Sequence, residues 1–270
     1  MMDKPIQILL TNDDGIQSPG LWAAAGALSE LGYVHVVAPR DQFSGAGRSL
    51  PSTSDGIITP QQMQVNGKLW TVYSVGGTPA QAVLHAICEI MPERPDLVVS
   101  GINYGENLGE GVTVSGTVGA AMEGAGNGIR GLAISLETDM ADHLSYSTKI
   151  DFSAAGYFTA LFGRMMLERH LPEDVDLLKV DVPSDASSST PWEVTRLSKQ
   201  AYFLPVMPKR DSWDKPETVG YRRIEELSGS AEDTDIYTLR VKRLVSVTPL
   251  SLDLTSRVSL TEFENLLRAE

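Results

Sequence analysis

The chain has 270 residues, 42% of them hydrophobic, and a formal net charge of −13. This composition is typical of a globular protein with one sizeable core, or with a core and a smaller lobe. The acidic balance argues against a nucleic-acid polymer as partner, because the chain has no basic stripe to displace counterions. The single cysteine, Cys88, excludes an intrachain disulfide framework. No run of 18 apolar residues is present, and we expect a cytoplasmic protein with no membrane partner.

Strand and helix patterns alternate along the first two thirds of the chain. Such alternation predicts an α/β fold with a mainly parallel sheet. In chain order the expected elements are a strand over Gln7–Thr11, a helix over 21–31 after Ser18-Pro19, a strand over Val34–Ala38, a helix from Thr78-Pro79-Ala80-Gln81 to about Met91, a strand over Asp96–Ser100, a helix from Ser115-Gly116 to about Gly126, a strand over Leu132–Leu136, a helix near Phe152–Arg169 and a strand over Leu177–Val182.

Other segments break this alternation. Residues 49–76 contain two hairpin turn signals, Asp55-Gly56 and Asn66-Gly67, and residues 101–114 read as a glycine-rich loop. After residue 184 the periodicity is weak, a strand or hairpin is expected over Ile236–Val247, and Ser259-x-x-Glu262 predicts a last helix over 261–268. We expect an α/β core over residues 1–190, with a hairpin insertion at about 49–76. The segment 191–270 is too small for a core of its own and is expected to pack on the first domain or on a partner subunit.

The most informative stretch is Asn12-Asp13-Asp14-Gly15, which follows the first expected strand. Two adjacent carboxylates repel each other and are costly to desolvate at the end of a buried strand. A divalent cation would remove that cost, and carboxylate and amide oxygens suit Mg²⁺, Mn²⁺ or Ca²⁺ better than zinc. Gly15 allows a sharp turn, so that both carboxylates can face one point. The alternative interpretation is a plain turn, because Asn, Asp and Gly all favour turns.

Three later stretches bring polar groups to the same edge of the expected sheet. Ser44-Gly45 follows the second strand, Asn103 follows the strand that ends at Ser100, and Ser115-Gly116-Thr117 opens a helix. Ligands of open α/β sheets bind outside the carboxyl ends of the strands, so we expect these residues to meet the acidic pair. The free N–H groups at a helix start favour an anion. Taken singly, these stretches also fit a flexible linker, a mobile loop and an ordinary helix cap.

Other chemistries have less support. Cys88 and Arg94 have the spacing of a cysteine-phosphatase loop, but the residues between them include two anions and no glycine. The histidines, at positions 35, 85, 143 and 170, form no pair with metal-ligand spacing. The chain has no Gly-x-Gly-x-x-Gly motif after a strand and no Walker-type loop.

Taken together, several stretches resemble the SurE (survival protein E) family of metal-dependent nucleotidases. They are Ile8–Gly15, Val37–Pro39 with Ser44-Gly45, Gly77-Thr78-Pro79, Pro95–Gly105, Asn107-Leu108-Gly109, Ser115–Gly124 and Val245–Leu250, in family order over nearly the whole chain. The resemblance implies a three-layer α/β/α sandwich with a mainly parallel, Rossmann-like sheet. It also implies an extended hairpin and a C-terminal segment that is exchanged between the subunits of a homodimer, with a homotetramer as a further assembly.

The same resemblance implies an activity and a set of site residues. The activity is hydrolysis of nucleoside 5′- and 3′-monophosphates to nucleoside and phosphate by metal-activated water. One divalent ion per subunit, Mg²⁺ or Mn²⁺ (Ca²⁺ in a crystal), would be held by Asp13, Asp14, Ser44 and Asn103. Asp13 or Asp14 would be catalytic and take the proton of the water, and the sequence leaves open which. The substrate phosphate would be bound by Asn12, Ser44, Gly45, Asn103, Ser115, Gly116 and Thr117.

Some positions depart from the family pattern. Ala80-Gln81 stands where Thr-Asp is frequent, Arg40-Asp41 reverses the usual order, and Phe43 replaces a basic residue. Lys179 and Asp181 stand where asparagines are usual. The four metal ligands are intact, so we expect catalysis to be retained, and the departures bear on base selectivity and phosphate affinity.

Functions of other classes make different demands on the sequence. A non-catalytic Mg²⁺-binding switch module also places an acidic pair after its first strand, but it needs an aspartate at a later strand end. Here that position reads Ser100-Gly101-Ile102-Asn103, and the chain is too long. A metal-dependent nucleotidyl or glycosyl transferase would use the same acidic site with an activated donor. Release of free phosphate from a plain monoester separates the transferase from a hydrolase.

Overall fold

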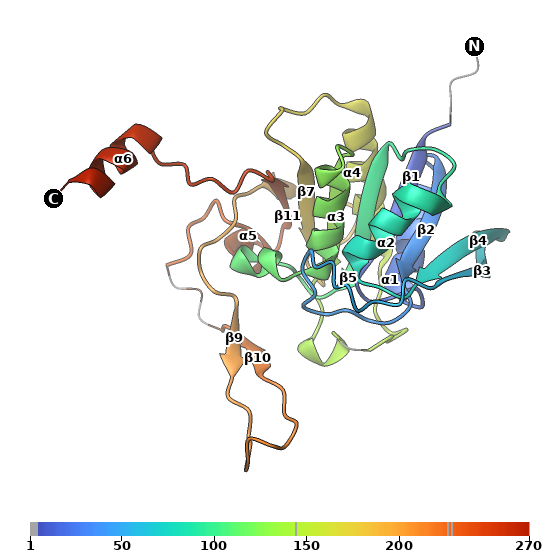
Figure 1. Ribbon diagram of the computed structural model, residues 1–270. Coiled ribbons are helices and arrows are strands. Elements are labelled where there is room, and N and C mark those ends of the chain that lie inside the picture. The colour runs from blue at the N-terminus through green and yellow to red at the C-terminus, as the bar shows by residue number, and fades with distance from the viewer. Residues whose placement is uncertain (1–4, 144, 226, 228, 270) are drawn as a thin grey trace.

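The structure, a computed structural model, describes residues 5–143, 145–225, 227 and 229–269. A mixed sheet runs through the molecule in the strand order β3-β4-β2-β1-β5-β6-β7-β11-β8 (Figure 1). Its strands are β1 Gln7–Thr11, β2 Tyr33–Pro39, β3 Ile58–Val65, β4 Lys68–Val75, β5 Leu97–Tyr104, β6 Gly131–Leu136, β7 Leu177–Val182, β8 Trp192–Val194 and β11 Val245–Leu250, while β9 Phe203–Val206 and β10 Gly220–Arg223 form a separate hairpin. The α-helices are α1 Pro19–Leu28, α2 Pro79–His85, α3 Gly116–Gly126, α4 Ser153–Glu168, α5 Asp235–Tyr237 and α6 Leu260–Arg268, and short helical turns cover Ala86–Ile90, Gly109–Thr113, Met140–Asp142 and Thr238–Lys242.

The core consists of two layers of apolar contacts, one on each face of the sheet. Helices α1 and α4 cover one face, where Leu21 and Phe158 pack with Leu10 of β1. Helix α2 and helix α3 cover the other face, where Val83 and Ala120 pack with Leu9. Successive residues of β1 point to opposite faces, and all of them are buried, because each face carries a helix layer. The predicted three-layer α/β/α sandwich is thereby confirmed.

The parallel order of the central strands positions the polar residues of interest. Strand β1 pairs in parallel with both β2 and β5, and β5 pairs in parallel with β6. The carboxyl ends of these strands therefore lie at one edge of the sheet, as predicted. The predicted helix start at Thr78-Pro79-Ala80-Gln81 is also confirmed, because Thr78 and Gln81 bond to each other's backbone N–H in a capping box at the start of α2.

Three sequence predictions are corrected by the structure. The Asn66-Gly67 turn joins β3 to β4, but Asp55-Gly56 precedes β3 and joins no strands. Residues 101–104 are strand and not loop, because β5 continues past Gly101 and pairs Asn103 with Ser135. A side chain at Gly101 would place its Cβ 2.3 Å from the Ile134 carbonyl oxygen, which explains the glycine inside this strand.

The third correction concerns Ile236–Val247, for which a strand or hairpin was predicted. Residues 235–242 are helical, and the strand begins at Val245. Ile236 and Leu239 are three residues apart and both enter a small apolar cluster with Leu108, so packing selects the helical period. The left-handed backbone of Arg243, with φ of 56°, ends this helical stretch.

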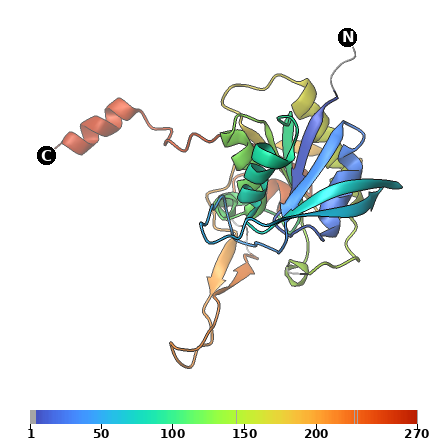
Figure 2. The ribbon, with the colours of Figure 1, turned by 45° about the vertical axis from the view of Figure 1, so that its right-hand side comes forward.

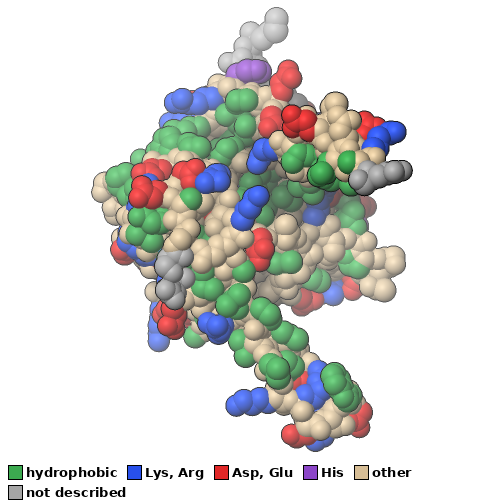
Figure 3. Space-filling view, turned by 90° about the vertical axis from the view of Figure 1, so that its left-hand side faces the viewer, with side chains coloured by type: hydrophobic (Ala, Val, Ile, Leu, Met, Phe, Trp, Pro, Cys, Tyr) green, Lys and Arg blue, Asp and Glu red, His purple; other side chains and the backbone are tan. Residues whose placement is uncertain are grey.

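The chain after residue 190 divides between the sheet and two projections. Strand β11 pairs antiparallel with β7, and β8 pairs with β11, so part of this segment completes the main sheet. The β9–β10 hairpin and the arm that ends in α6 extend away from the body (Figure 2). Figure 3 shows hydrophobic side chains along the projecting hairpin, where Met207 and Trp213 are exposed. Among the described residues, no helix has the length and apolar character needed to cross a membrane.

Candidate active site

The acidic pair stands in a tight turn directly after β1. Gly15 has a φ of 93°, a conformation that side chains with a Cβ rarely adopt, so this position requires a glycine. Asn12 braces the turn, because its amide group donates to the Gly15 carbonyl oxygen and accepts from the Gly15 N–H. Asn12 is therefore fully buried in the turn, and both the nitrogen and the oxygen of its side-chain amide are hydrogen-bonded to Gly15.

The carboxylate of Asp13 is held by the start of helix α3. The Thr117 hydroxyl donates to Asp13 Oδ1 at 2.5 Å, and a Cβ at Gly116 would lie 2.7 Å from Asp13 Cβ. Burial raises the pKa of Asp13, while hydrogen bonds from the Thr117 hydroxyl and from backbone N–H groups oppose this rise. The helix start, predicted to face a phosphate, thus faces an aspartate through Gly116 and Thr117.

Asp14 is held by groups from three other segments. Gln42 Nε2 donates to Asp14 Oδ1 at 3.1 Å, and the Tyr104 N–H donates to Oδ2 at 3.2 Å. The Tyr146 hydroxyl donates to the Asp14 main-chain oxygen at 2.8 Å. Burial, followed by the charge of Asp13, raises the pKa of Asp14 well above its ordinary value. Two buried carboxylates with raised pKa values form an anionic centre that a cation would stabilise.

The acidic pair opens into a cavity of about 460 Å³. Its wall at this end also contains Ser44, Gly45, Asn103 and Ser115, so the structure brings these predicted residues together with Asp13 and Asp14. We call this part of the cavity the acidic end. Asn103 Nδ2 donates to the Gly105 carbonyl oxygen at 2.7 Å, which leaves the amide oxygen of Asn103 for a ligand. Ser115 caps α3 by accepting the Val118 N–H at 3.1 Å.

The donor set of the acidic end fits a hard divalent cation. Two carboxylates, a hydroxyl and an amide oxygen are the ligand types of Mg²⁺, Mn²⁺ and Ca²⁺. In the part of the chain that the structure describes, no group of three or more His, Cys, Asp or Glu side chains is placed to hold a metal ion. A site of two aspartates with Ser44 and Asn103 therefore has to rely on neutral oxygens and water for its remaining ligands.

The same cavity is also lined by rings, and we call this part of its wall the ring end. It contains His143, Tyr202, Phe203 and Tyr221. The rings of His143 and Tyr221 are stacked with an interplanar angle of 21°, and Phe203 meets Tyr221 edge-on with the centroids 5.3 Å apart. The Tyr221 hydroxyl lies 3.1 Å from His143 Nδ1. His143 Nε2 is buried and has no hydrogen-bond partner among the described residues.

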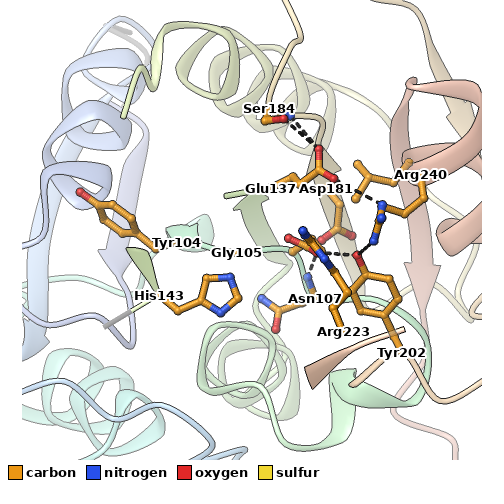
Figure 4. Close-up of polar contacts among 12 residues, drawn as sticks. Tyr104, Gly105, Asn107, Glu137, His143, Asp181, Ser184, Tyr202, Arg223 and Arg240 are labelled. Atoms are coloured by element: carbon orange, nitrogen blue, oxygen red, sulfur yellow. Dashed lines mark hydrogen bonds and ion pairs between the residues drawn. The ribbon is translucent and has the colours of Figure 1, made fainter. Parts of the chain in front are cut away.

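A buried carboxylate, Glu106, ties the ring end to the C-terminal segment. Glu106 Oε1 accepts from the Tyr202 hydroxyl at 2.5 Å and from Arg223 Nη1 at 3.0 Å. Arg240 Nη1 in turn donates to the Tyr202 hydroxyl at 2.6 Å, as Figure 4 shows. Burial and the neighbouring Glu106 charge raise the pKa of Tyr202, so the phenol stays protonated and acts as a donor.

Sequence reasoning missed the ring end and the residues that support Asp14. Gln42 lies two residues before the predicted Ser44, so its place in the same loop was a signal that could have identified it. His143, Phe203 and Tyr221 come from segments without clear periodicity, and only the tertiary fold brings them together.

Comparison with known proteins decides the family. The family model described as Survival protein SurE matches residues 8–203. The chain belongs to the SurE family. It is 43% identical to the 5′-nucleotidase SurE of Thermococcus gammatolerans over 98% of this chain and 97% of that protein. It is 44% identical to the 5′-nucleotidase SurE of Archaeoglobus fulgidus over 94% of each. The crystal structure of the SurE protein from Aquifex aeolicus, 33% identical, superposes with a TM-score of 0.73 and covers 97% of this chain and 99% of that one.

Membership in the SurE family confirms the resemblance seen in the sequence. The matched region contains every residue of the acidic end, and it stops at Phe203 at the start of the β9–β10 hairpin. Tyr221 of the ring end lies beyond it.

Proposed function

We propose that this protein is a metal-dependent nucleotidase that hydrolyses nucleoside 5′- and 3′-monophosphates to nucleoside and phosphate. The observation that carries the proposal is one cavity of about 460 Å³ that is lined both by the two carboxylates and by aromatic rings. The acidic end suits a phosphate held by a cation, and the ring end suits a nucleobase. A relative that is 43% identical over nearly the full length of both chains is named a 5′-nucleotidase, which supports this proposal.

In this proposal Asp13, Asp14, Ser44 and Asn103 hold one Mg²⁺ or Mn²⁺ ion. When bound, the ion neutralises phosphoryl charge and lowers the pKa of a coordinated water. Hydrogen bonds from neighbouring groups orient the two carboxylates. Thr117 orients Asp13, while Gln42 and the Tyr104 N–H orient Asp14.

The remaining residues bind the substrate and exclude water. The phosphate would lie against Ser44, Gly45 and Ser115, which line the acidic end. The base would pack against Tyr221 and Phe203, whose rings line the same cavity. One of the two aspartates would take the proton of the attacking water.

The test is phosphate release from a panel of 5′- and 3′-nucleoside monophosphates with Mg²⁺, with Mn²⁺ and with EDTA. Release that depends on the metal and stops in EDTA supports the proposal and ranks the substrates. Equal release in EDTA would contradict a metal-dependent reaction. Turnover of an activated nucleotide donor without any release from plain monoesters would favour a transferase.

We also propose that the segment 191–270 mediates assembly into a homodimer, with a homotetramer as a further state. Helix α6 supports this proposal, because it projects from the body (Figure 1) with Leu260, Phe263, Leu266 and Leu267 exposed. Such a face is stable in water when a second copy covers it. Light scattering on the purified chain and on a chain that ends at residue 252 measures both masses. The same number of chains per particle in both proteins would contradict a role of the arm in assembly.

A further inference from the structure

One wall of the cavity is a loop whose position bears on the acidic end. Residues 105–111, which we call the pocket loop, supply several of the residues that line the cavity. The Gly105 carbonyl oxygen accepts from the Asn103 side chain at 2.7 Å, so the loop orients a proposed metal ligand. Gly109 has a φ of 57°, and a Cβ there would lie 2.9 Å from the Gln200 carbonyl oxygen, so the loop packs closely on the C-terminal segment.

Three charged side chains are buried behind this loop. Lys179 and Asp181 lie on β7, two residues apart and therefore on the same face, and Asp235 begins α5. All three side chains have no solvent exposure. Lys179 forms an ion pair with Asp181, and its Nζ lies 3.2 Å from Asp235 Oδ2. Burial alone would lower the pKa of Lys179, but the two carboxylates outweigh it and raise that pKa, so the ammonium stays charged.

Both carboxylates also accept hydrogen bonds from the backbone of the pocket loop. Asp181 Oδ1 accepts the Asn107 N–H at 2.7 Å (Figure 4), and Asp235 Oδ2 accepts the Gly109 N–H at 2.8 Å. Asp235 Oδ1 accepts the Ser198 N–H at 2.9 Å from the C-terminal segment. One ammonium thus holds two carboxylates, and these carboxylates join β7, the pocket loop and the segment after residue 190.

Stability alone is a poor account of this arrangement. A buried ion pair loses in desolvation most of what its attraction supplies, and apolar residues of the same volume are often as stable. Apolar side chains cannot accept the N–H groups of Asn107 and Gly109, whereas a carboxylate fixed by Lys179 can. The charges therefore supply what packing cannot, which is a defined position for the loop backbone.

We propose that Lys179, Asp181 and Asp235 are positioning residues that fix the pocket loop for substrate hydrolysis. This inference rests on the proposed nucleotidase function, because the loop lines the cavity of that reaction. The triad touches neither substrate nor metal, and it acts through the backbone of the loop and the Asn103 side chain that the loop holds.

The test compares Asp181→Leu with Asp181→Asn. Both variants remove the same charge and leave the neutral pair Lys179–Asp235. Asparagine keeps an acceptor for the Asn107 N–H and gives up only the contact with Lys179 Nζ, whereas leucine has neither. We expect hydrogen–deuterium exchange of the pocket loop, measured without substrate, to quicken by about tenfold or more in Asp181→Leu and to stay within about threefold in Asp181→Asn. Unchanged exchange in the leucine variant, or equally fast exchange in both, would overturn the proposal.

Kinetics add a readout that a merely structural role would not move. We expect the leucine variant to lose about tenfold in kcat at saturating metal, because Asn103 loses its support at Gly105, and the asparagine variant to restore it. If wild-type protein releases no phosphate while the exchange pattern is as expected, the proposed function fails and the positioning of the loop stands. If exchange follows expectation and kcat is equal in all three proteins, the catalytic part of the inference is wrong.

A second variant keeps the proposal testable if Asp181→Leu does not fold. The single side-chain oxygen of Asp235→Asn can accept from Gly109 or from Ser198, but not from both at their present positions. Exchange at one of these two amides should therefore quicken, while that of Asn107 stays slow. Unchanged exchange at both amides would contradict the assigned contacts.

Discussion

The acidic end and the ring end of the cavity are built in different ways. The acidic end takes its two carboxylates from adjacent residues, Asp13 and Asp14, at the end of a strand that is buried on both faces. The ring end takes its side chains from a loop after β6, from Tyr202 just before β9 and from the β9–β10 hairpin, and the first of these is far from the others in the chain. The acidic end is thus fixed by the sheet, whereas the ring end depends on how the C-terminal segment packs.

This difference suggests a division of work between the two ends. The acidic side chains are nearly fully buried and held by several hydrogen bonds, as a reaction centre requires. Tyr221 is 45% exposed and lies on a projecting hairpin, which suits a contact with a variable part of the substrate. We therefore expect changes at the acidic end to lower turnover and changes at the ring end to weaken binding.

The largest effect is expected from Asp14→Asn. Removal of this carboxylate takes away a proposed metal ligand, so kcat/KM should fall by at least about 10³-fold, as for other losses of preorganised charge. The fold should persist, because the variant removes one of two repelling buried charges. Phosphate release and thermal unfolding measure the two effects. Full turnover by the variant would show that the metal site is elsewhere.

A smaller loss is expected from Thr117→Val. Valine keeps the shape but removes the hydroxyl that donates to Asp13, a bond to a charged group that is worth about 1.5–3 kcal/mol. We expect kcat/KM to fall about 10- to 100-fold and more Mg²⁺ to be needed for half-maximal rate. Thr117→Ser, which keeps a hydroxyl, is the matched control. Equal loss in both variants would mean that the hydrogen bond does not matter.

At the ring end we expect an effect on KM and not on kcat. Tyr221→Ala removes a ring worth about 1–3 kcal/mol of base stacking, so KM for a nucleoside monophosphate should rise about tenfold. KM for ribose 5-phosphate, which has no base, should not change. Tyr221→Phe keeps the ring and should behave like wild type with both substrates. A parallel rise in KM for both substrates would argue against a base at this end.

The smallest effect concerns pH and His143. Burial lowers the pKa of His143 below 6.5. The charge of Glu106 raises this pKa and the charge of Arg223 lowers it, but burial has the largest effect. Below pH 6.5 the unfolded chain binds a proton at this position that the folded chain does not, so the free energy of unfolding falls as pH falls. Urea unfolding between about pH 7 and about pH 5 should show a shallower decline for His143→Gln than for wild type. A steeper decline in the variant would reverse the sign of this argument.

The acidic end could be predicted from the sequence because its signals are local. A strand, an adjacent acidic pair and a glycine follow one another, and the sheet then brings Ser44, Asn103 and Ser115 to the same edge. The structure adds what local patterns do not contain. The start of α3 binds the Asp13 side chain, because the turn after β1 directs that carboxylate at Thr117.

The ring end and the C-terminal segment were harder to predict for a physical reason. Their apolar residues cover small satellite clusters or face solvent, so no long periodic pattern marks them. The sequence around Ile236 predicts a strand or hairpin where the chain is helical, because contacts with Leu108 decide its period. Lys179 and Asp181 were visible in the sequence as unusual residues, but their partner Asp235 lies 54 residues beyond Asp181, and only the fold joins them.

The division between the two ends is tested most directly by kinetics on two substrates. Phosphate release from a nucleoside 5′-monophosphate and from ribose 5-phosphate is measured side by side, with Mg²⁺ and after addition of EDTA. We predict similar kcat values for both substrates, a KM about tenfold lower for the nucleotide, and loss of both activities in EDTA. Equal KM values, or activity that survives EDTA, would contradict the assignment of binding to the rings and of chemistry to the acidic pair.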